Sequence, residues 1–131
     1  MRRLLTLREF REIIPKICRK DTSADPDNWT PDNPLWGHCA IVAVLVQDLF
    51  DGTILRASLE GTPFAHMRSH YWNDFCGISV DFTADQFDDS YPQRLRPEVS
   101  SREHILDQHP DTTMRYNRLK ERLYKKMFGH T

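Results

Sequence analysis

The feature that most constrains this chain is an apolar run from Ala40 to Val46, the longest in the sequence. The segment turns polar at Gln47 and Asp48, continues to Phe50 and stops at Asp51-Gly52, where a glycine is the expected end of a helix. A helix that is hydrophobic on nearly all sides has to be buried. We therefore predict a central, buried helix, opened by the stretch Gly37-His38-Cys39-Ala40, with Cys39 in its first turn.

The rest of the chain predicts helices around a few strands. Apolar residues at helical spacing indicate an amphipathic helix over 6–18, with Thr6 as its N-cap and Glu9 completing a capping box. A segment rich in Asp, Asn and Pro follows and predicts an irregular loop. We expect the loop at 21–35, strands at 53–59, 67–73 and 78–83, and closing helices at 101–108 and 112–128. This order predicts an α+β fold with an antiparallel sheet in one domain, 1–131.

Composition excludes several classes of protein. The net charge of -1 predicts no affinity for nucleic acid, and no apolar stretch is long enough to cross a membrane. Charged residues follow Met1–Leu5 at once, so no signal peptide is expected. Three cysteines without CxxC spacing argue against disulfides and a thiolate zinc site. We expect a cytoplasmic protein, monomeric or weakly dimeric, that holds no cofactor or metal.

The hairpin predicted at 67–83 makes a geometric prediction. A two-residue loop at Phe75-Cys76, or a four-residue loop from Asp74 to Gly77, pairs His70 with Asp81 on one face of the sheet. Side chains paired in this way lie within hydrogen-bond reach. A three- or five-residue loop would spoil the direct pairing.

A carboxylate bound to one imidazole nitrogen leaves the other nitrogen to activate a nucleophile. Cys39 is the candidate, because the positive end of a helix dipole and a neighbouring imidazolium both favour a thiolate. Cysteine at a helix N-terminus, followed by histidine and acid on adjacent strands, is the order of papain-like and transglutaminase-like enzymes. We therefore expect a core of that type, with Cys39, His70 and Asp81 as a catalytic triad.

Several motifs in the same order resemble a little-characterised bacterial family called YunG-like. The main motifs lie within residues 29–87, and the tail resembles the family's closing helix. They are Trp36–Ala40, Val46–Arg56, Ser69–Asn73, Asp81–Phe87 and, in the tail, Asp111–Leu119. The family has no assigned reaction, so the resemblance implies a site and leaves the substrate open.

One position departs from the expected pattern, since Gly37-His38-Cys39 stands where we expect Gly-Gln-Cys. In papain-like enzymes a glutamine near the nucleophile donates to the oxyanion, and the imidazole of His38 would need a suitable tautomer to do so. Further residues are expected to bind substrate or line the cleft. These are Trp36, Trp72, Asn73 and Gln86.

The leading function is therefore acyl transfer on an amide by a thiol, acting on a peptide or a small amide-containing ligand. One alternative is a non-catalytic protein that binds such a ligand in a cleft of Trp36, Tyr71 and Trp72. A second is an interaction protein that uses the basic stretch 115–126. A mixed zinc site of His38, Cys39 and His70 is disfavoured, because neighbouring residues on a helix point about 100° apart.

Overall fold

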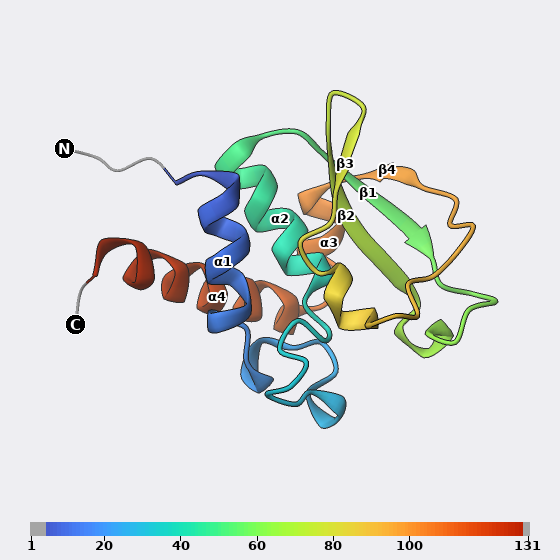
Figure 1. The fold of residues 1–131 in the computed structure, drawn as a ribbon, viewed down its shortest axis with the longest axis horizontal. Coiled ribbons are helices and arrows are strands. Elements are labelled where there is room, and N and C mark those ends of the chain that lie inside the picture. Colours follow the sequence, from blue (N-terminus) through green and yellow to red (C-terminus); the bar gives the residue numbers. More distant parts are fainter. Residues whose placement is uncertain (1–4, 130–131) are drawn as a thin grey trace.

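The structure is a computed structural model that describes residues 5–129 (Figure 1). The expectation that Met1–Leu5 begins no signal peptide falls on residues of which all but Leu5 lie outside this range. None of the helices within 5–129 combines the length and apolar character needed to cross a bilayer.

Four α-helices match the predicted positions closely. They are α1 (Leu7–Ile17), α2 (Cys39–Phe50), α3 (Arg102–Leu106) and α4 (Pro110–Phe128). The predicted capping box of α1 is confirmed, because the Thr6 hydroxyl accepts a hydrogen bond from the Glu9 amide at 3.1 Å. Ser101 caps α3 in the predicted manner. Helix α4 starts two residues before the prediction, because Pro110 fits the first helical turn, where no amide donor is required.

The strands form one antiparallel sheet of order β3-β2-β1-β4, so the predicted α+β class is confirmed. The strands are β1 (Thr53–Ser58), β2 (Ser69–Phe75), β3 (Ile78–Val80) and β4 (Glu98–Ser100). Strand β4 was not predicted, because three residues within a proline-rich stretch carry too little alternation to signal a strand. It is held by its antiparallel pairing with β1.

The predicted register of the hairpin is wrong by two residues. Phe75 pairs with Ile78 and Asn73 with Val80, so the loop is Cys76-Gly77. Both loop residues have positive φ, as a tight two-residue hairpin turn favours, and Gly77 supplies this conformation without strain. A shift of two residues leaves every side chain on its predicted face.

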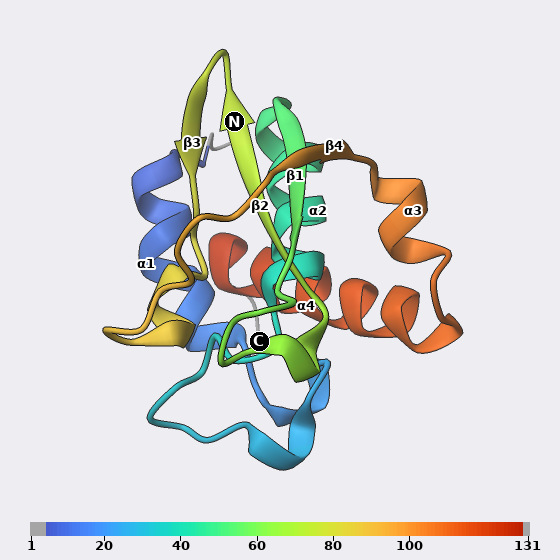
Figure 2. The ribbon, with the colours of Figure 1, turned by 90° about the vertical axis from the view of Figure 1, so that its right-hand side faces the viewer.

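Helix α2 is the centre of the fold. The sheet covers one side of it and α1 and α4 lie on the other (Figures 1 and 2). All residues from Ile41 to Val46 are buried, as the apolar run predicted. Asn73 on β2 donates a hydrogen bond to the Ala43 carbonyl of α2 at 3.0 Å. The sheet and helix are thus joined by a polar contact within the core, which holds Cys39 in a defined position.

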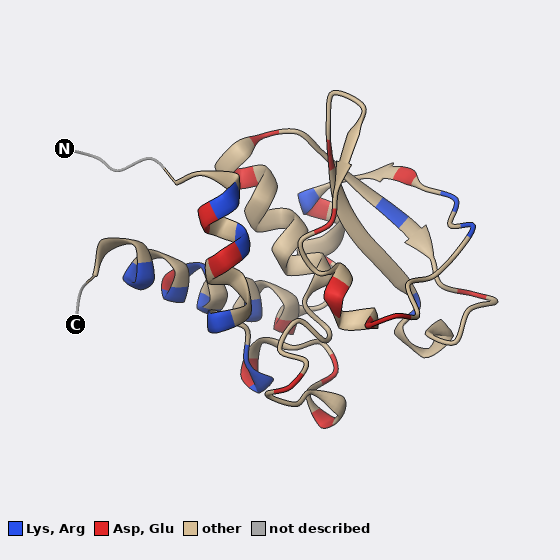
Figure 3. Cartoon of the chain, viewed as in Figure 1, with Lys and Arg blue, Asp and Glu red and all other residues tan. Residues whose placement is uncertain are grey.

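The basic residues on α4 bind the chain that follows α1 (Figure 3). Arg122 donates to both carboxylate oxygens of Asp21, and Arg118 donates to the Asp21 carbonyl at 2.9 Å. Arg115 donates to the Thr22 carbonyl at 3.3 Å. Three of the basic side chains proposed for an outside partner therefore make contacts within the protein.

Arg122→Gln is expected to lower the free energy of unfolding by about 1 kcal/mol, because it removes a bidentate ion pair that is only partly exposed. Urea unfolding measures the change. Lys126→Gln is the matched control, since it removes an equal charge from an exposed position on the same helix. Equal stability of the two variants would show that the Arg122 contact with Asp21 contributes nothing.

Candidate functional site

His70 and Asp81 lie together, as expected, although Asp81 follows the end of β3. The His70 Nε2 atom lies 2.6 Å from Oδ2 of Asp81. A carboxylate only accepts, so Nε2 carries the hydrogen. With the observed register, an extension of β3 would place Asp81 opposite Trp72, which shares a face with His70. The two side chains therefore meet diagonally and not as a direct cross-strand pair.

The environment of His70 favours its charged form. Burial of the ring, which is 0% exposed, acts to lower its pKa. The hydrogen bond to Asp81 and the neighbouring Cys39 outweigh burial and raise the pKa of His70 to about 9. Burial also acts to raise the pKa of Asp81, but its hydrogen bonds, above all the one from His70, hold that pKa below the usual value. Together they form an imidazolium–carboxylate pair at neutral pH.

Asp81 is held by two further residues. The Tyr91 hydroxyl donates to Oδ2 at 2.7 Å, and the Thr83 amide donates to Oδ1 at 3.1 Å. Tyr91 lies in a stretch without regular structure, and its ring contacts the His70 ring edge-on with 5.9 Å between centroids. Tyr91 had no recognisable sequence signal, because its role depends on where a long loop returns to the sheet. It fixes the carboxylate that in turn orients His70.

Cys39 is the first residue of α2 and is 8% exposed. The Nδ1 atom of His70 is buried and has no hydrogen-bond partner among residues 5–129. Since Nε2 is bound to Asp81, Nδ1 is the atom through which Cys39 acts on the ring. Catalytic hydrogen bonds are often long before substrate binds, so the unpartnered Nδ1–H of the imidazolium beside Cys39 is suited to give its proton to a leaving group.

The structure corrects the role expected for His38. Its ring is 0% exposed, with Nδ1 2.9 Å from the Trp36 carbonyl and Nε2 2.7 Å from the Thr22 hydroxyl. A carbonyl only accepts, so Nδ1 carries the hydrogen and Nε2 of the neutral ring accepts from Thr22. Burial lowers the pKa of His38 to about 4. With both nitrogens bound inside the protein, His38 has no donor left for an oxyanion.

The two tryptophans lie at different places from those expected for a common cleft. Trp36 donates to the Asp25 carboxylate at 3.0 Å and stacks on the His66 ring. Trp72 stacks on His70 with 5.5 Å between ring centroids and an interplanar angle of 23°. Trp72 therefore supports the histidine, while Trp36 anchors the loop before α2. Neither lines the cavity that contains Cys39.

The two amides expected to bind substrate hold the backbone instead. Besides the contact of Asn73 with α2, Gln86 joins two loops at the site. Its Oε1 accepts from the Gly37 amide at 3.2 Å, and its Nε2 donates to the Thr83 hydroxyl at 3.0 Å. Gln86 thus links the segment before Cys39 to the segment after Asp81, and this contact fixes the position of the thiol relative to the carboxylate.

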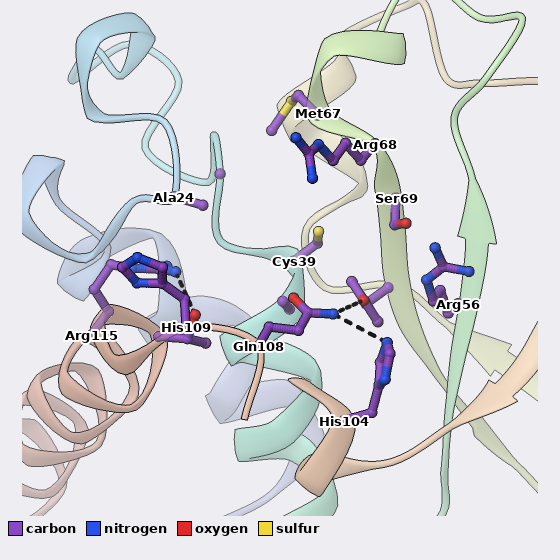
Figure 4. Close-up of a pocket in the computed structure, with 14 residues that line it drawn as sticks. Ala24, Cys39, Arg56, Met67, Arg68, Ser69, His104, Gln108, His109 and Arg115 are labelled. Carbon is purple, nitrogen blue, oxygen red and sulfur yellow. Dashed lines mark hydrogen bonds between the residues drawn. The ribbon is translucent and has the colours of Figure 1, made fainter. Parts of the chain in front are cut away.

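A cavity of about 580 Å³ opens beside Cys39 (Figure 4). Its walls come from the loop before α2, from β1 and β2, and from the end of α3 and the start of α4. Sequence reasoning missed most of these residues, because they come together only through the packing of α3 and α4. The lining residues are Ala24, Gly37, Cys39, Ala40, Arg56, Met67, Arg68, Ser69, Tyr71, His104, Gln108, His109, Thr112 and Arg115.

Gln108 joins two other lining residues of the cavity. Its Nε2 lies 3.1 Å from the Tyr71 hydroxyl and 3.1 Å from Nε2 of His104 (Figure 4). A helix was predicted through this position, but α3 ends at Leu106, and no motif marked Gln108. The amide spans the cavity wall opposite the sheet and fixes two polar side chains near Cys39.

The other cysteines are differently placed. Cys18 is buried, and burial raises its pKa, whereas Cys76 lies exposed in the hairpin loop. Within 5–129, no cluster of three or more His, Cys, Asp or Glu residues is arranged to hold a metal ion. The mixed zinc site of His38, Cys39 and His70 is therefore not formed. Of the three cysteines, Cys39 is the one that lies at a helix N-terminus and beside the ring of His70.

Comparisons with known proteins give a family and no reaction. The family model described as YunG protein matches residues 6–128. The Uncharacterized protein YunG of Bacillus subtilis (strain 168) is 34% identical over 59 residues, which are 45% of this chain and 46% of the relative. The aligned region thus spans about half the length of that curated relative. No solved structure gives a significant match to the chain.

Proposed function

The chain belongs to the YunG protein family, and from the geometry around Cys39 we propose that it is a thiol-dependent acyl-transfer enzyme acting on an amide. Cys39 is the nucleophile, His70 the general base and acid, and Asp81 the residue that orients His70. The observation that carries the proposal is the pair of ring nitrogens of His70: Nε2 is held by Asp81, and the buried Nδ1 has no hydrogen-bond partner among residues 5–129. The hydrogen bond to Asp81 and the neighbouring Cys39 together raise the pKa of the ring.

The reaction follows from these positions. The Cys39 sulfur attacks the amide carbonyl carbon, forming a C–S bond and an oxyanion. As the oxyanion collapses, the C–N bond breaks and the proton on His70 Nδ1 passes to the leaving amine. Water or a second amine then attacks the acyl group and gives its proton to Nδ1, while Cys39 leaves as a thiolate. Hydrolysis, deamidation and transamidation share this sequence and differ in which acceptor enters.

The oxyanion has a donor in the first turn of α2. His38 makes no side-chain cap, and the first amides of a helix have no partner within the helix. The amide of Cys39 therefore lies at the positive end of α2, beside the sulfur that attacks. This contact takes the place of the side-chain donor that His38 does not supply.

The order of the three groups also supports a papain-like or transglutaminase-like core as part of this proposal. Cys39 starts a buried helix, His70 lies on the strand that packs against it, and Asp81 follows the next strand. The cavity beside Cys39 is large enough for a peptide segment or a small amide ligand.

Cys39 is expected to react with iodoacetamide at pH 7 about tenfold or more faster than Cys76, because the His70 imidazolium and the helix N-terminus stabilise the negative charge on its sulfur during the attack. Cys76 is an internal control, since it is exposed in the hairpin loop and lacks these neighbours. Peptide mapping by mass spectrometry after timed alkylation gives both rates in one sample.

An alkylation rate of Cys39 at or below that of Cys76 would contradict the proposal that Cys39 is an activated nucleophile. The fold would then be better described as a protein that binds a ligand in the same cavity without reaction. The cavity walls support that second function independently of the thiol, through Tyr71, Gln108 and the arginines beside them.

A further inference from the structure

The cavity beside Cys39 has a one-sided charge. Three arginines and two histidines line it, and no acidic side chain is among the lining residues that the structure describes. The protein as a whole is close to neutral, with a net charge of -1, so this excess of cationic groups is local. A pocket lined by one sign of charge attracts ligands of the other sign.

Carboxylates outside the cavity compensate two of the three arginines. Arg115 pairs with Asp111 at 2.8 Å, and Arg56 pairs through Nη1 with Glu98 at 2.8 Å. Arg68 has no ion pair or side-chain hydrogen bond with any residue in the range 5–129 and points toward the space above Cys39 (Figure 4). Its charge is therefore available to a ligand.

Arg56 leaves a second donor open. Its Nε atom is buried and has no hydrogen-bond partner among the described residues, although Nη1 binds Glu98. A buried donor without a partner is uncommon in folded proteins and calls for an acceptor. Arg56 lies across the cavity wall from Arg68, with Ser69 between them in Figure 4. An anion in the cavity would face Arg68 and the exposed part of the Arg56 side chain, which is 31% exposed.

The backbone of Arg68 is strained. Its φ is 69° and its ψ is -57°, in a region that favours glycine. Two hydrogen bonds hold it there, since its amide donates to the Ala65 carbonyl at 3.0 Å and its carbonyl accepts from the Leu59 amide at 2.8 Å. The chain thus keeps an arginine in a costly conformation at the cavity mouth.

We propose that Arg68 and Arg56 form a carboxylate-binding subsite, and that the acyl substrate carries a carboxylate group near its reactive amide. This inference rests on the proposed function and specifies its substrate class. A carboxylate accepts hydrogen bonds from guanidinium groups in a directional, often bidentate manner, which orients the substrate as well as attracting it. The amide carbonyl would then lie toward Cys39.

The test compares two reagents of nearly equal size, iodoacetate with a carboxylate and iodoacetamide without one. In each, the Cys39 thiolate forms a C–S bond and displaces iodide. Arg68→Gln is expected to lower the ratio of the iodoacetate rate to the iodoacetamide rate by about three- to tenfold at low salt. Arg68→Lys should retain most of the ratio. Arg8→Gln, which removes an equal charge from an exposed position on α1, should leave it unchanged.

The outcomes separate the two proposals. Equal ratios in Arg68→Gln and Arg8→Gln, with a fast Cys39, would overturn the carboxylate subsite and leave the nucleophile intact. If Arg68→Gln lowers the ratio but Cys39 reacts no faster than Cys76, the carboxylate subsite is supported and the proposed enzymatic activity is contradicted. Titration of succinate into isotope-labelled protein gives a readout that needs no reaction. Succinate should shift the amide resonances of residues 67–69, and succinamide should leave them unchanged. The absence of any shift with succinate would contradict the subsite.

Discussion

His70→Ala is expected to slow the alkylation of Cys39 by iodoacetamide at pH 7 by about 10- to 100-fold. The imidazolium that stabilises negative charge on the attacking sulfur is lost, and only the helix N-terminus remains. Asp81 also loses its buried partner, so the carboxylate adds a repulsive charge near the sulfur. The rate of Cys76 should stay the same, because it lies in the distant hairpin loop.

His66→Ala is the matched control, since it removes an exposed histidine that stacks on Trp36 and does not line the cavity with Cys39. Its Cys39 rate should equal that of the unmodified protein. Circular dichroism and urea unfolding establish that each variant remains folded at the pH of the assay. A folded His70→Ala protein with an unchanged Cys39 rate would contradict the proposed pair.

The free energy of unfolding is expected to pass through a maximum near pH 6.5, because two buried histidines titrate in opposite directions. The pKa of His70 rises from 6.5 in the unfolded chain to about 9, and that of His38 falls from 6.5 to about 4. Each side chain is 0% exposed, so solvent screens neither shift appreciably.

The two slopes follow from proton linkage. Above pH 6.5 the folded chain holds the His70 proton that the unfolded chain has lost, so stability falls as pH rises toward 9. Below pH 6.5, His38 binds a proton in the unfolded chain but stays neutral in the folded chain, so stability falls as pH drops toward 4. Each slope is about 1.4 kcal/mol per pH unit, and each histidine accounts for at most about 3 kcal/mol.

Urea unfolding at pH 4–9 measures the curve, and two variants assign its sides. His70→Ala should flatten the alkaline side only. His38→Gln should flatten the acid side only, because the glutamine amide supplies a donor and an acceptor and does not titrate. The slope of each stability curve against pH is the quantity compared, so a uniform loss of stability caused by the substitution does not affect the result. An alkaline slope that persists in His70→Ala would show that another group causes it.

Several parts of the fold were predictable because their signals are local. The apolar run of α2 and its glycine stop lie within one segment, and so does the Thr6 capping box of α1. Strand β4 was not predictable, because three residues carry no pattern of their own and pair only because β1 is present. The hairpin register failed for a related reason: loops of neighbouring lengths fit the same sequence, and the choice depends on the turn at Cys76-Gly77.

The candidate site divides in the same way. The proximity of His70 and Asp81 survived a wrong register, because an error of two residues preserves the face of a strand. The role expected for His38 did not survive. Its sequence position beside Cys39 says nothing about which way the ring points, and packing turned it inward toward Thr22 and Trp36.

The sequence by itself indicated that Cys39 starts a buried helix and that Asp81 comes near His70, because helical and strand periodicity act over a few residues. Tertiary structure alone decided that Tyr91 binds Asp81 and that Arg56, Arg68 and Gln108 share a cavity with Cys39. These contacts join segments far apart in the chain, and their geometry depends on how α3, α4 and the loops pack around the sheet.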